Sequence, residues 1–318
     1  MQSNQDLYAT NNEGVEFDWM NPLLTDMYQI KMCYASWKGN RHDETAIFEM
    51  FFRKCPFKGK YAIFCGHEEV YKFLDTYKFT PQHIEFLKMS IPHAEPEFFE
   101  YLSNLDCSSI KIRGMPEGEI VFPEEPLFSL EGPIVLLQLI ETPLLNMTNF
   151  STLLCTNATR MVQVAGNSKC VEFGLRRAQG PNGAMIASKF SYLGGFVGTS
   201  NVYAAYLNGI PSLGTVAHSY IMSFEKEEDI ANTRVVDGVD LLEAAMKYRT
   251  ELGWNETNMG ELYAYVGFAY AYPTAFSALV DSYSTMNSGI KNYLLLALVL
   301  KDLGYTVGGI RLDSGDLA

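Results

Sequence analysis

The chain has 318 residues, and 47% of them are hydrophobic, so it can bury the core of one large domain or of two ordinary ones. Its 24 Lys and Arg residues against 37 Asp and Glu residues give a net charge of −13, the wrong sign for general attraction to nucleic acid or to an anionic membrane. The longest apolar run, residues 293–300, is far too short to cross a bilayer. We therefore expect no nucleic-acid partner and no membrane partner, and an anionic ligand would need a local basic cluster.

Residues 1–19 are polar and turn-rich and are predicted to be a flexible tail, without the basic flank and apolar core of a signal peptide. The six cysteines show no CxxC pair and no Cys/His spacing that could close a tetrahedral metal site. Reduced thiols in a cytoplasmic protein are therefore expected. These cysteines are Cys33, Cys55, Cys65, Cys107, Cys155 and Cys170.

Residues 20–134 are predicted to form an amino-terminal α+β domain. Helical stretches such as MYQIKMCYASW occur there with aromatic and β-branched runs such as AIFEMFF and YAIFCG. Proline-containing turns at residues 91–96 and 122–126 punctuate the later part of this segment.

Residues 135–318 show a different pattern, in which helical segments alternate with short apolar strands. The expected strands are KCVEFG, SLGTVAH, FSALVD and YTVGGIRLD. The expected helices include LLQLIETPLLNMTNFSTLLCTNATRMVQVAG, SNVYAAYLNG with a glycine cap, VDLLEAAMKYRTELG and NSGIKNYLLLALVLKDLGY. This alternation is typical of βα units and a parallel sheet, either an open doubly wound sheet or a barrel.

Polar residues end these strands, and in α/β folds the chemistry gathers where the carboxyl ends of the strands meet. Arginines, with Lys189 nearby, can bind carboxylate or phosphate oxygens, and aspartates can hold a Mg²⁺ that carries phosphates or can bind ribose hydroxyls. The strand-end residues are Arg176, Arg177, His218, Ser219, Asp281, Ser282, Tyr283, Arg311, Asp313, Ser314, Gly315 and Asp316.

Each of these features also has a purely structural explanation. Arginine and aspartate at strand ends often form ion pairs without a chemical role, and a histidine such as His218 after a strand is more often a hydrogen-bonded core residue. The chain has no Walker glycine loop, no GxGxxG after a first strand, no HExxH and no GxSxG. The residue pattern alone therefore predicts an α/β enzyme that acts on an anionic, phosphorylated small molecule.

Eight motifs occur in order along the chain: NPLLTDMYQIKM, EMFFRKCPF, ETPLLN, EFGLRRAQGP, SYLGGFVGTSNVYAA, GIPSLGTVAHSY, LVDSYST and GIRLDSGDLA. From about Asn21 onward, the chain resembles the nicotinate phosphoribosyltransferase family. The resemblance implies the type II phosphoribosyltransferase fold, an amino-terminal α+β domain followed by an irregular, TIM-like α/β barrel. It also implies synthesis of nicotinate mononucleotide from nicotinate and phosphoribosyl pyrophosphate in NAD salvage, coupled to ATP hydrolysis and using Mg²⁺.

The resemblance assigns roles to residues through the motifs that contain them. His218 of the GTVAHS motif corresponds to the phosphorylated histidine of the family. The family forms homodimers with shared active sites, so Tyr28, supplied by the neighbouring subunit, would stack on the pyridine ring against Phe173. The remaining residues implied are Arg176, Thr215 and Arg311 for the nicotinate carboxylate or the pyrophosphate, and Asp281 and Asp313 for the ribose or Mg²⁺. Carboxylates at this place also stabilise the oxocarbenium character left by the departing pyrophosphate.

Ser200 is the residue expected to set the choice of pyridine. Nicotinamide-specific relatives place an aspartate in the segment that aligns with GTSN, and its counterpart here is Ser200, or Thr199 or Asn201 if the alignment shifts by one. A neutral hydroxyl can donate to the carboxylate of nicotinate without repulsion, so nicotinate is expected to be preferred.

The chain ends at Ala318, just after the LDSGD loop. We expect the barrel to be incomplete there, with the family's glycine-containing phosphate loops beyond this residue and an exposed sheet edge. Two alternatives to the nicotinate enzyme therefore stay open: a nicotinamide-specific phosphoribosyltransferase, and an inactive dimerising fragment of such an enzyme.

Overall fold

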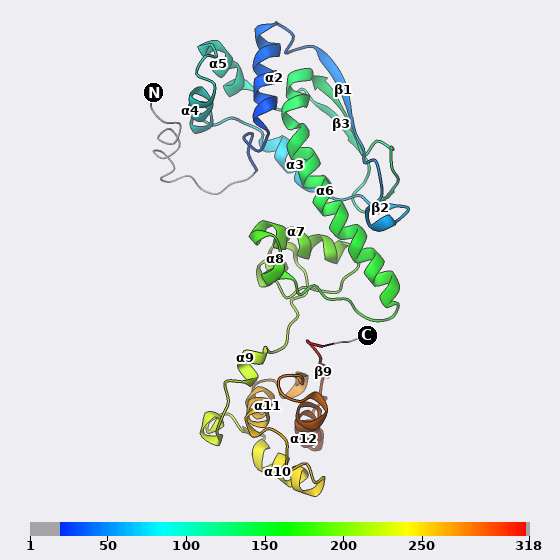
Figure 1. The fold of residues 1–318 in the computed structure, drawn as a ribbon, viewed down its shortest axis with the longest axis vertical. Helices are drawn as coiled ribbons and strands as arrows, with labels where there is room; N and C mark the ends of the chain where they lie inside the picture. The colour runs from blue at the N-terminus through cyan, green and yellow to red at the C-terminus, as the bar shows by residue number, and fades with distance from the viewer. Residues whose placement is uncertain (1–19, 316–318) are drawn as a thin grey trace. The chain divides into compact units, whose positions relative to one another are not determined.

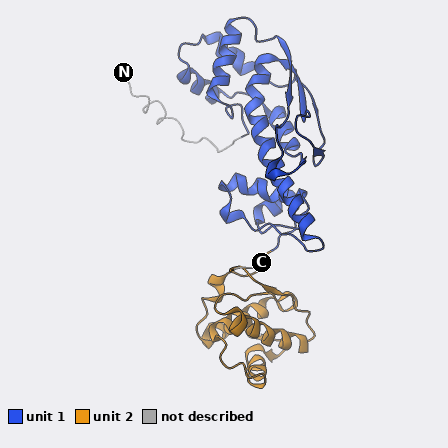
Figure 2. Cartoon of the chain, turned by 45° about the vertical axis from the view of Figure 1, so that its right-hand side comes forward, with its two compact units in different colours: residues 1–213 blue, residues 214–318 orange. Residues whose placement is uncertain are grey.

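The computed structural model describes residues 20–315, so the predicted tail and Asp316 lie outside the described residues. The chain divides into two compact units, residues 1–213 and 214–318 (Figure 2). The predicted domain boundary between residues 134 and 135 falls within the first unit, at the start of helix α6 (Ile134–Ala165), and it stays a prediction.

The amino-terminal part of the first unit mixes helices with antiparallel strands, as predicted for an α+β domain. Its main sheet has the order β1-β5-β3, and alternate residues of the central strand β5 are buried. The register pairs Thr45 of β1 with Pro133 of β5, and Lys111 of β3 with Glu131 of β5. The strands are β1 (Thr45–Met50), β2 (Ala62–Ile63), β3 (Lys111–Gly114), β4 (Ile120–Val121) and β5 (Phe128–Pro133). The helices are α2 (Met27–Lys38), η1 (Pro56–Lys58), α3 (His67–Thr76), α4 (Pro81–Ser90) and α5 (Pro96–Asn104).

Helix α6 connects the two halves of the first unit. It begins after Pro133, contains Pro143 and ends at Gly166, whose φ of 60° suits a residue without a Cβ. Its early part packs on α2, β1 and β5, and its later part packs on α7 (Gly180–Leu193). Figure 1 shows α2 beside the beginning of α6 and α7 beside its later part.

The other half of the first unit contains three short parallel strand segments, joined by isolated β-bridges, together with helices. Glu172 bridges Thr199, which in turn bridges Ser212. The predicted strand KCVEFG and the first part of SLGTVAH are therefore extended and parallel, although the ladder is only one bridge wide. Helix α8 (Val202–Asn208) follows the middle strand and ends at Gly209 with a φ of 64°, as the glycine-cap pattern predicts. The 3₁₀ turn η2 (Leu175–Arg177) follows the first strand.

The second unit contains a parallel pair of strands, β8 (Ala278–Leu279) and β9 (Ile310–Arg311), which confirms the strands predicted in FSALVD and YTVGGIRLD. Its helices α10 and α12 confirm two predicted helices, whereas α11, which the sequence pattern missed, is apolar on most of its surface. The elements are α9 (His218–Ile221), η3 (Glu227–Ile230), β6 (Val235–Val236), β7 (Val239–Asp240), α10 (Leu241–Glu251), α11 (Met259–Ala271), η4 (Pro273–Ala275), η5 (Thr285–Gly289) and α12 (Ile290–Asp302).

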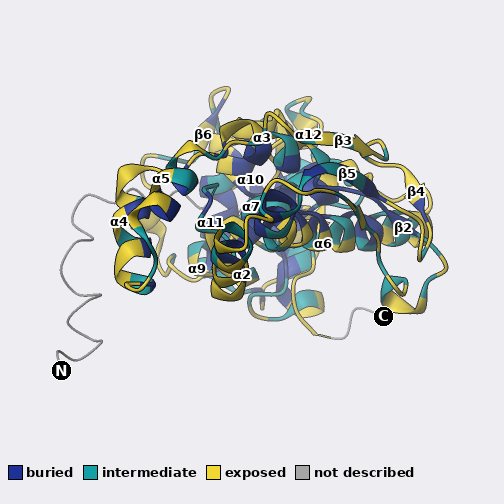
Figure 3. Ribbon diagram, turned by 90° about the horizontal axis from the view of Figure 1, so that it is seen from above, coloured by how far each residue is buried: buried dark blue, intermediate teal, exposed yellow. Residues whose placement is uncertain are grey.

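Each unit buries a large apolar cluster of its own. Figure 3 colours the ribbon by the burial of each residue. All six cysteines are free thiols. Within residues 20–315, no helix combines the length and the apolar character that spanning a membrane requires.

Candidate active site

Five of the predicted site residues come together at one end of the β8–β9 pair in the second unit. Because β8 and β9 are parallel, with Leu279 beside Arg311, their carboxyl ends lie at the same edge. Asp281 follows β8, Arg311 ends β9, and Asp313 follows β9 two residues later.

His218 lies between the two aspartates. It is the first residue of α9, and its Nε2 is 3.1 Å from Asp281 Oδ1. Its Nδ1 is 4.0 Å from Asp313 Oδ2, which is too far for a hydrogen bond. The His218 side chain is 36% exposed, whereas the Asp281 side chain is only 5% exposed. The buried carboxylate therefore holds Nε2, and the rest of the imidazole is accessible to solvent.

The Asp281 carboxylate is fixed by three hydrogen bonds. Its Oδ2 accepts from the backbone N–H of Asp313 and from the hydroxyl of Ser314, both at 2.7 Å, while Oδ1 faces His218. Burial alone would raise the pKa of Asp281, but these hydrogen bonds outweigh it and lower the pKa below its ordinary value. The group is therefore an ionised acceptor at neutral pH, and His218 Nε2 is the donor between them.

Arg311 closes the cluster on its other side. Its guanidinium donates to Asp313 Oδ1 at 2.6 Å and to the Thr215 hydroxyl at 2.8 Å. An ion pair of this kind holds the β9 loop, and a partly exposed guanidinium can also bind a phosphate or carboxylate oxygen. Next to Asp281 in the chain, the hydroxyl of Ser282 is buried and has no hydrogen-bond partner among residues 20–315.

The two aspartates alone do not make a metal cage. Among the residues that the structure describes, no group of three or more His, Cys, Asp and Glu side chains is arranged to hold a metal ion. Mg²⁺ often binds through only one or two carboxylates together with substrate phosphates, so Asp281 and Asp313 fit an ion that a phosphorylated ligand brings with it.

The predicted residues of the first unit lie around its three parallel strands. Phe173 follows the first strand and is 41% exposed, and Arg176 in η2 is exposed as well. Ser200 ends the middle strand and is half-buried. Tyr28, on α2, is 51% exposed and belongs to the other half of this unit.

Glu172 is a site-supporting residue that the sequence analysis missed. Its buried carboxylate accepts from Ser188 Oγ at 2.8 Å, from Thr199 Oγ1 at 2.6 Å and from the backbone N–H of Gly174. It therefore ties the strand end at Phe173 to the GTSN segment. Its place in the EFG motif was the only signal in the sequence.

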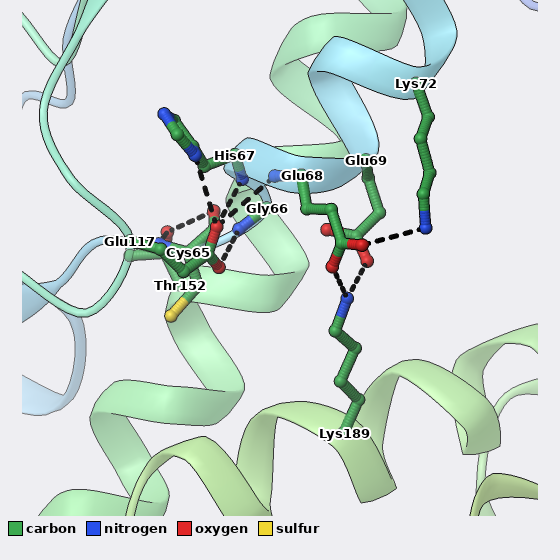
Figure 4. A network of polar contacts seen from close by, with 9 residues as sticks. All are labelled: Cys65, Gly66, His67, Glu68, Glu69, Lys72, Glu117, Thr152 and Lys189. Carbon is green, nitrogen blue, oxygen red and sulfur yellow. Dashed lines mark hydrogen bonds and ion pairs between the residues drawn. The ribbon is translucent and has the colours of Figure 1, made fainter. Parts of the chain in front are cut away.

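Lys189 is not part of an anion site, so the prediction that it supports the arginines needs correction. Its Nζ lies 2.8 Å from Glu68 Oε2 and 2.6 Å from Glu69 Oε1, and both carboxylates come from α3 (Figure 4). These two pairs neutralise its charge and join α7 to α3. Beside them, the Glu117 carboxylate accepts from the backbone N–H groups of Gly66 and His67 at the start of α3, each at 2.9 Å.

Parallel strands with a histidine, two carboxylates and an arginine at their carboxyl ends are the arrangement in which α/β folds commonly place a ligand site. Residues 23–149 match the family model described as nicotinate phosphoribosyltransferase (NAPRTase) N-terminal domain, and residues 168–264 match that of the nicotinate phosphoribosyltransferase (NAPRTase) family. The chain belongs to the nicotinate phosphoribosyltransferase family.

Individual relatives support this assignment. The chain is 48% identical to a nicotinate phosphoribosyltransferase of Dictyostelium discoideum over 305 residues, which is 94% of this chain and 52% of the relative. It is 47% identical to nicotinate phosphoribosyltransferase 2 of Arabidopsis thaliana, over 96% of this chain and 58% of the relative. The chain thus spans about half the length of the curated relatives it matches.

Solved structures show the same fold. The crystal structure of human nicotinic acid phosphoribosyltransferase matches 92% of this chain and 61% of its own, with a TM-score of 0.85 and 42% identity. The crystal structure of nicotinate-nucleotide pyrophosphorylase from Pyrococcus furiosus matches with a TM-score of 0.56 at 20% identity, over 96% of this chain and 69% of its own. The second match shows the fold alone. Together they establish the type II phosphoribosyltransferase fold.

Proposed function

We propose that the protein is a nicotinate phosphoribosyltransferase, which makes nicotinate mononucleotide and pyrophosphate from nicotinate and phosphoribosyl pyrophosphate, with coupled ATP hydrolysis. The observation that carries the proposal is the cluster of His218, Asp281, Arg311, Asp313 and Thr215. These residues come from three motifs far apart in the chain, and the fold brings them within hydrogen-bond or near hydrogen-bond distance. A cytoplasmic location is part of the proposal, and the six free thiols suit a reducing compartment.

The tautomer of His218 determines which of its nitrogens can accept a phosphoryl group. Asp281 is an ionised acceptor, so Nε2 carries the proton that is donated to it. Nδ1 then holds the lone pair and is the nucleophile toward the γ-phosphorus of ATP. As the new N–P bond forms, the bond from the γ-phosphorus to the β–γ bridging oxygen breaks and ADP leaves with that electron pair. The ring becomes positively charged, and the nearby carboxylates stabilise that charge.

In the glycosyl transfer, charge develops at two places. The departing pyrophosphate is anionic and needs a cationic partner, for which Arg311 of this cluster is suited. The ribose carbon gains oxocarbenium character, and the Asp281 and Asp313 carboxylates supply negative charge on that side. Mg²⁺, held by these two aspartates and by phosphate oxygens, would add neutralisation of the pyrophosphate.

A homodimer with shared sites is the arrangement that best accounts for the two aromatic rings. Thr25 and Gln29 of the α2 segment bond to the carbonyls of Leu139 and Gln138, early in α6. The α7 helix contacts α6 at Phe150, beside Gly183, which is 11 residues or about 17 Å further along the axis than Leu139. Both rings are well exposed, which supports a stack in which Tyr28 and Phe173 come from different subunits.

Ser200 is the best candidate for the residue that faces the pyridine substituent. Thr199 and Asn201 are almost fully buried, and their side chains bond to Glu172 and Ser188 inside the first unit. Ser200 is the one residue of the three whose side chain is partly exposed at the strand end. Its hydroxyl can donate to a carboxylate, which favours nicotinate over nicotinamide.

The test is conversion of ring-labelled nicotinate and, separately, of nicotinamide by the protein, with and without phosphoribosyl pyrophosphate. The proposal predicts mononucleotide from nicotinate only when phosphoribosyl pyrophosphate is present, stimulation by ATP, and a higher kcat/KM for nicotinate. Preferred use of nicotinamide, or no mononucleotide from either ring, would overturn it. His218→Ala should abolish the ATP stimulation and serves as the matched control.

A further inference from the structure

A buried glutamate lies behind the site, outside the proposed chemistry. Glu261 is completely buried on α11, and its Oε2 accepts from Ser288 Oγ at 2.5 Å and from Asn292 Nδ2 at 3.0 Å. Its other oxygen, Oε1, is buried and receives no hydrogen bond from any residue that the structure describes. Asn292, completely buried on α12, has an equally unpartnered acceptor, Oδ1.

The surroundings of the Glu261 carboxyl lack the cation that a buried, ionised carboxylate usually has beside it. Within residues 20–315, Glu261 forms no ion pair with Lys, Arg or His. A buried carboxylate without a cation costs several kcal/mol, and this cost is usually avoided by taking up a proton. Burial accordingly raises the pKa of Glu261 above its ordinary value.

The hydroxyl of Tyr265, one turn further along α11, points to the same conclusion. Its single proton goes to the carbonyl of Leu279 at 2.7 Å. The Tyr265 hydroxyl also contacts the Glu261 carboxyl, and this contact lowers the pKa of Glu261 against the larger, opposite effect of burial. While the Tyr265 proton stays on the Leu279 carbonyl, however, the Tyr265 oxygen can only accept from Glu261. A proton on Oε1 would convert an orphan acceptor into a donor toward Tyr265 Oη or Asn292 Oδ1.

Within residues 20–315, the elements around Glu261 place no cation against its carboxyl, and a further charge, that of Asp281, acts on Tyr265. The η5 and α12 segments present Ser288 and Asn292, which do not titrate, and Tyr265 is the titratable neighbour on α11 itself. From α10, Arg249 is committed to Thr257 and to the Asn255 carbonyl, and the η3 carboxylates act on Tyr263 on another face of α11.

This buried group is connected to the site through two routes. Tyr265 holds the Leu279 carbonyl, two residues before Asp281. Ser288 lies in η5, whose Gly289 packs so closely on Val280 that an added Cβ would lie 2.0 Å from the Val280 carbonyl oxygen. Glu261 therefore holds Ser288 of η5 directly, and it is linked to the end of β8 only through Tyr265.

We infer that Glu261 is a neutral carboxylic acid in the native protein and is the positioning residue that fixes the Asp281 loop. Its effect on chemistry rests on the proposed function, whereas its protonation state does not. The two parts can therefore fail separately, because the first is tested without ATP or any pyridine.

The first experiment compares the unfolding equilibrium of the wild type and Glu261→Gln between about pH 5 and pH 9. The unfolded carboxyl titrates at about 4.3, so between that pH and the raised pKa of the folded state the native wild type holds one proton more than the unfolded chain. Its unfolding constant then rises by up to tenfold per pH unit, and the glutamine variant lacks this rise. The inference is supported if the unfolding constant of the wild type, divided by that of Glu261→Gln, rises at least about tenfold from pH 5 to pH 9. A ratio constant within about twofold overturns it.

Glu172→Gln is the matched control, since Glu172 is also buried but accepts from three donors and has no orphan oxygen. A glutamine there must place its amide N–H₂ against a donor, so this variant should lose stability at every pH. If Glu261→Gln does not fold, the infrared spectrum of the wild type still decides the matter. A protonated-carboxyl C=O band at neutral pH that shifts on ¹³C-glutamate labelling supports the inference, and its absence refutes it.

The positioning role is read from hydrogen exchange at Ser288 and Gly289, whose amides donate to the Ser284 carbonyl at 2.8 and 3.0 Å. Glu261→Ala should speed exchange at both amides at least about tenfold, and Glu261→Gln should restore the protection. ATP-dependent labelling of His218 should follow the same order. Equal exchange in the alanine and glutamine variants would show that the carboxyl does not hold the loop.

Discussion

Replacing Asp281 with Asn should stop phosphorylation of His218 by reversing the tautomer of its imidazole. Asp281 Oδ2 receives two donors, the Asp313 N–H and the Ser314 hydroxyl, so the single oxygen of an asparagine must stay on that side. Its N–H₂ group then faces His218 Nε2 and donates to it. The imidazole proton is forced onto Nδ1, which loses the lone pair that attacks the γ-phosphate.

The loss in the rate of His218 phosphorylation can be estimated from the Asp→Asn substitution in Ser-His-Asp triads, where the wrong histidine tautomer lowers kcat about 10⁴-fold. Because His218 is partly exposed and its ring can reorient, we expect a loss of at least about 10²-fold in the rate of labelling. Charge-assisted hydrogen bonds are also lost, so the second unit should lose about 2 kcal/mol of stability.

The assay is transfer of label from γ-labelled ATP, followed by identification of the phosphohistidine isomer. Wild-type protein should carry acid-labile, base-stable phosphate on Nδ1, and nitrogen NMR of His218 should show the proton moved from Nε2 to Nδ1 in the variant. The control is Asp302→Asn, the same substitution at an exposed aspartate that bonds Tyr248. Labelling of Asp281→Asn at the wild-type rate, or phosphate on Nε2 of the wild type, would refute the reasoning.

The stability difference between wild type and Asp281→Asn should also depend on pH in one direction. The pKa of Asp281 is lowered in the folded state, so its contribution is present above the unfolded value of about 3.9. It is lost as the pH falls through the folded-state pKa. Unfolding curves should therefore differ by a constant amount from about pH 5 to pH 8 and converge in stronger acid.

Three further predictions concern the first unit. Mixing a Tyr28→Ala protein with an Arg176→Ala protein should restore part of the activity through a hybrid site, and no recovery despite subunit exchange would place both residues in one subunit. Lys189→Met should destabilise the protein by about 1–2 kcal/mol, because Glu69 is mostly buried, whereas Lys72→Met, which breaks an exposed pair, should cost under about 0.5 kcal/mol. Ser200→Asp should weaken nicotinate use by about 2 kcal/mol in kcat/KM relative to nicotinamide, and unchanged selectivity would remove Ser200 from the ring site.

The sequence predicted the strand ends because each polar group there follows a short apolar run directly. Asp281 after FSALV and Arg311 within the last strand needed only the alternation of strands and helices to be placed at the edge of a parallel sheet. The sequence could not predict the distances among them, which depend on the register of β8 against β9 and on where α9 begins.

Residues whose partners are remote in the chain were beyond sequence reasoning. Lys189 pairs with Glu68 and Glu69, about 120 positions away, and nothing local distinguishes it from a lysine that binds an anion. Glu172 looked like one polar residue inside a strand pattern, although its carboxylate joins two strand ends.

Glu261 shows why a missed helix also hides a polar core. The segment that contains it, MGELYAYVGFAYA, is apolar on most faces, so it has no periodic pattern that marks which side is buried. Once α11 packs against η5 and α12, its one glutamate has no route to solvent, and its neighbours on both elements are polar for that reason. The hydroxyl, amide and carboxyl groups around Glu261 thus form one buried network, in which the polar groups must hydrogen-bond to one another because water cannot reach them. In our proposal, this network also sets the position of Asp281 at the edge of the site.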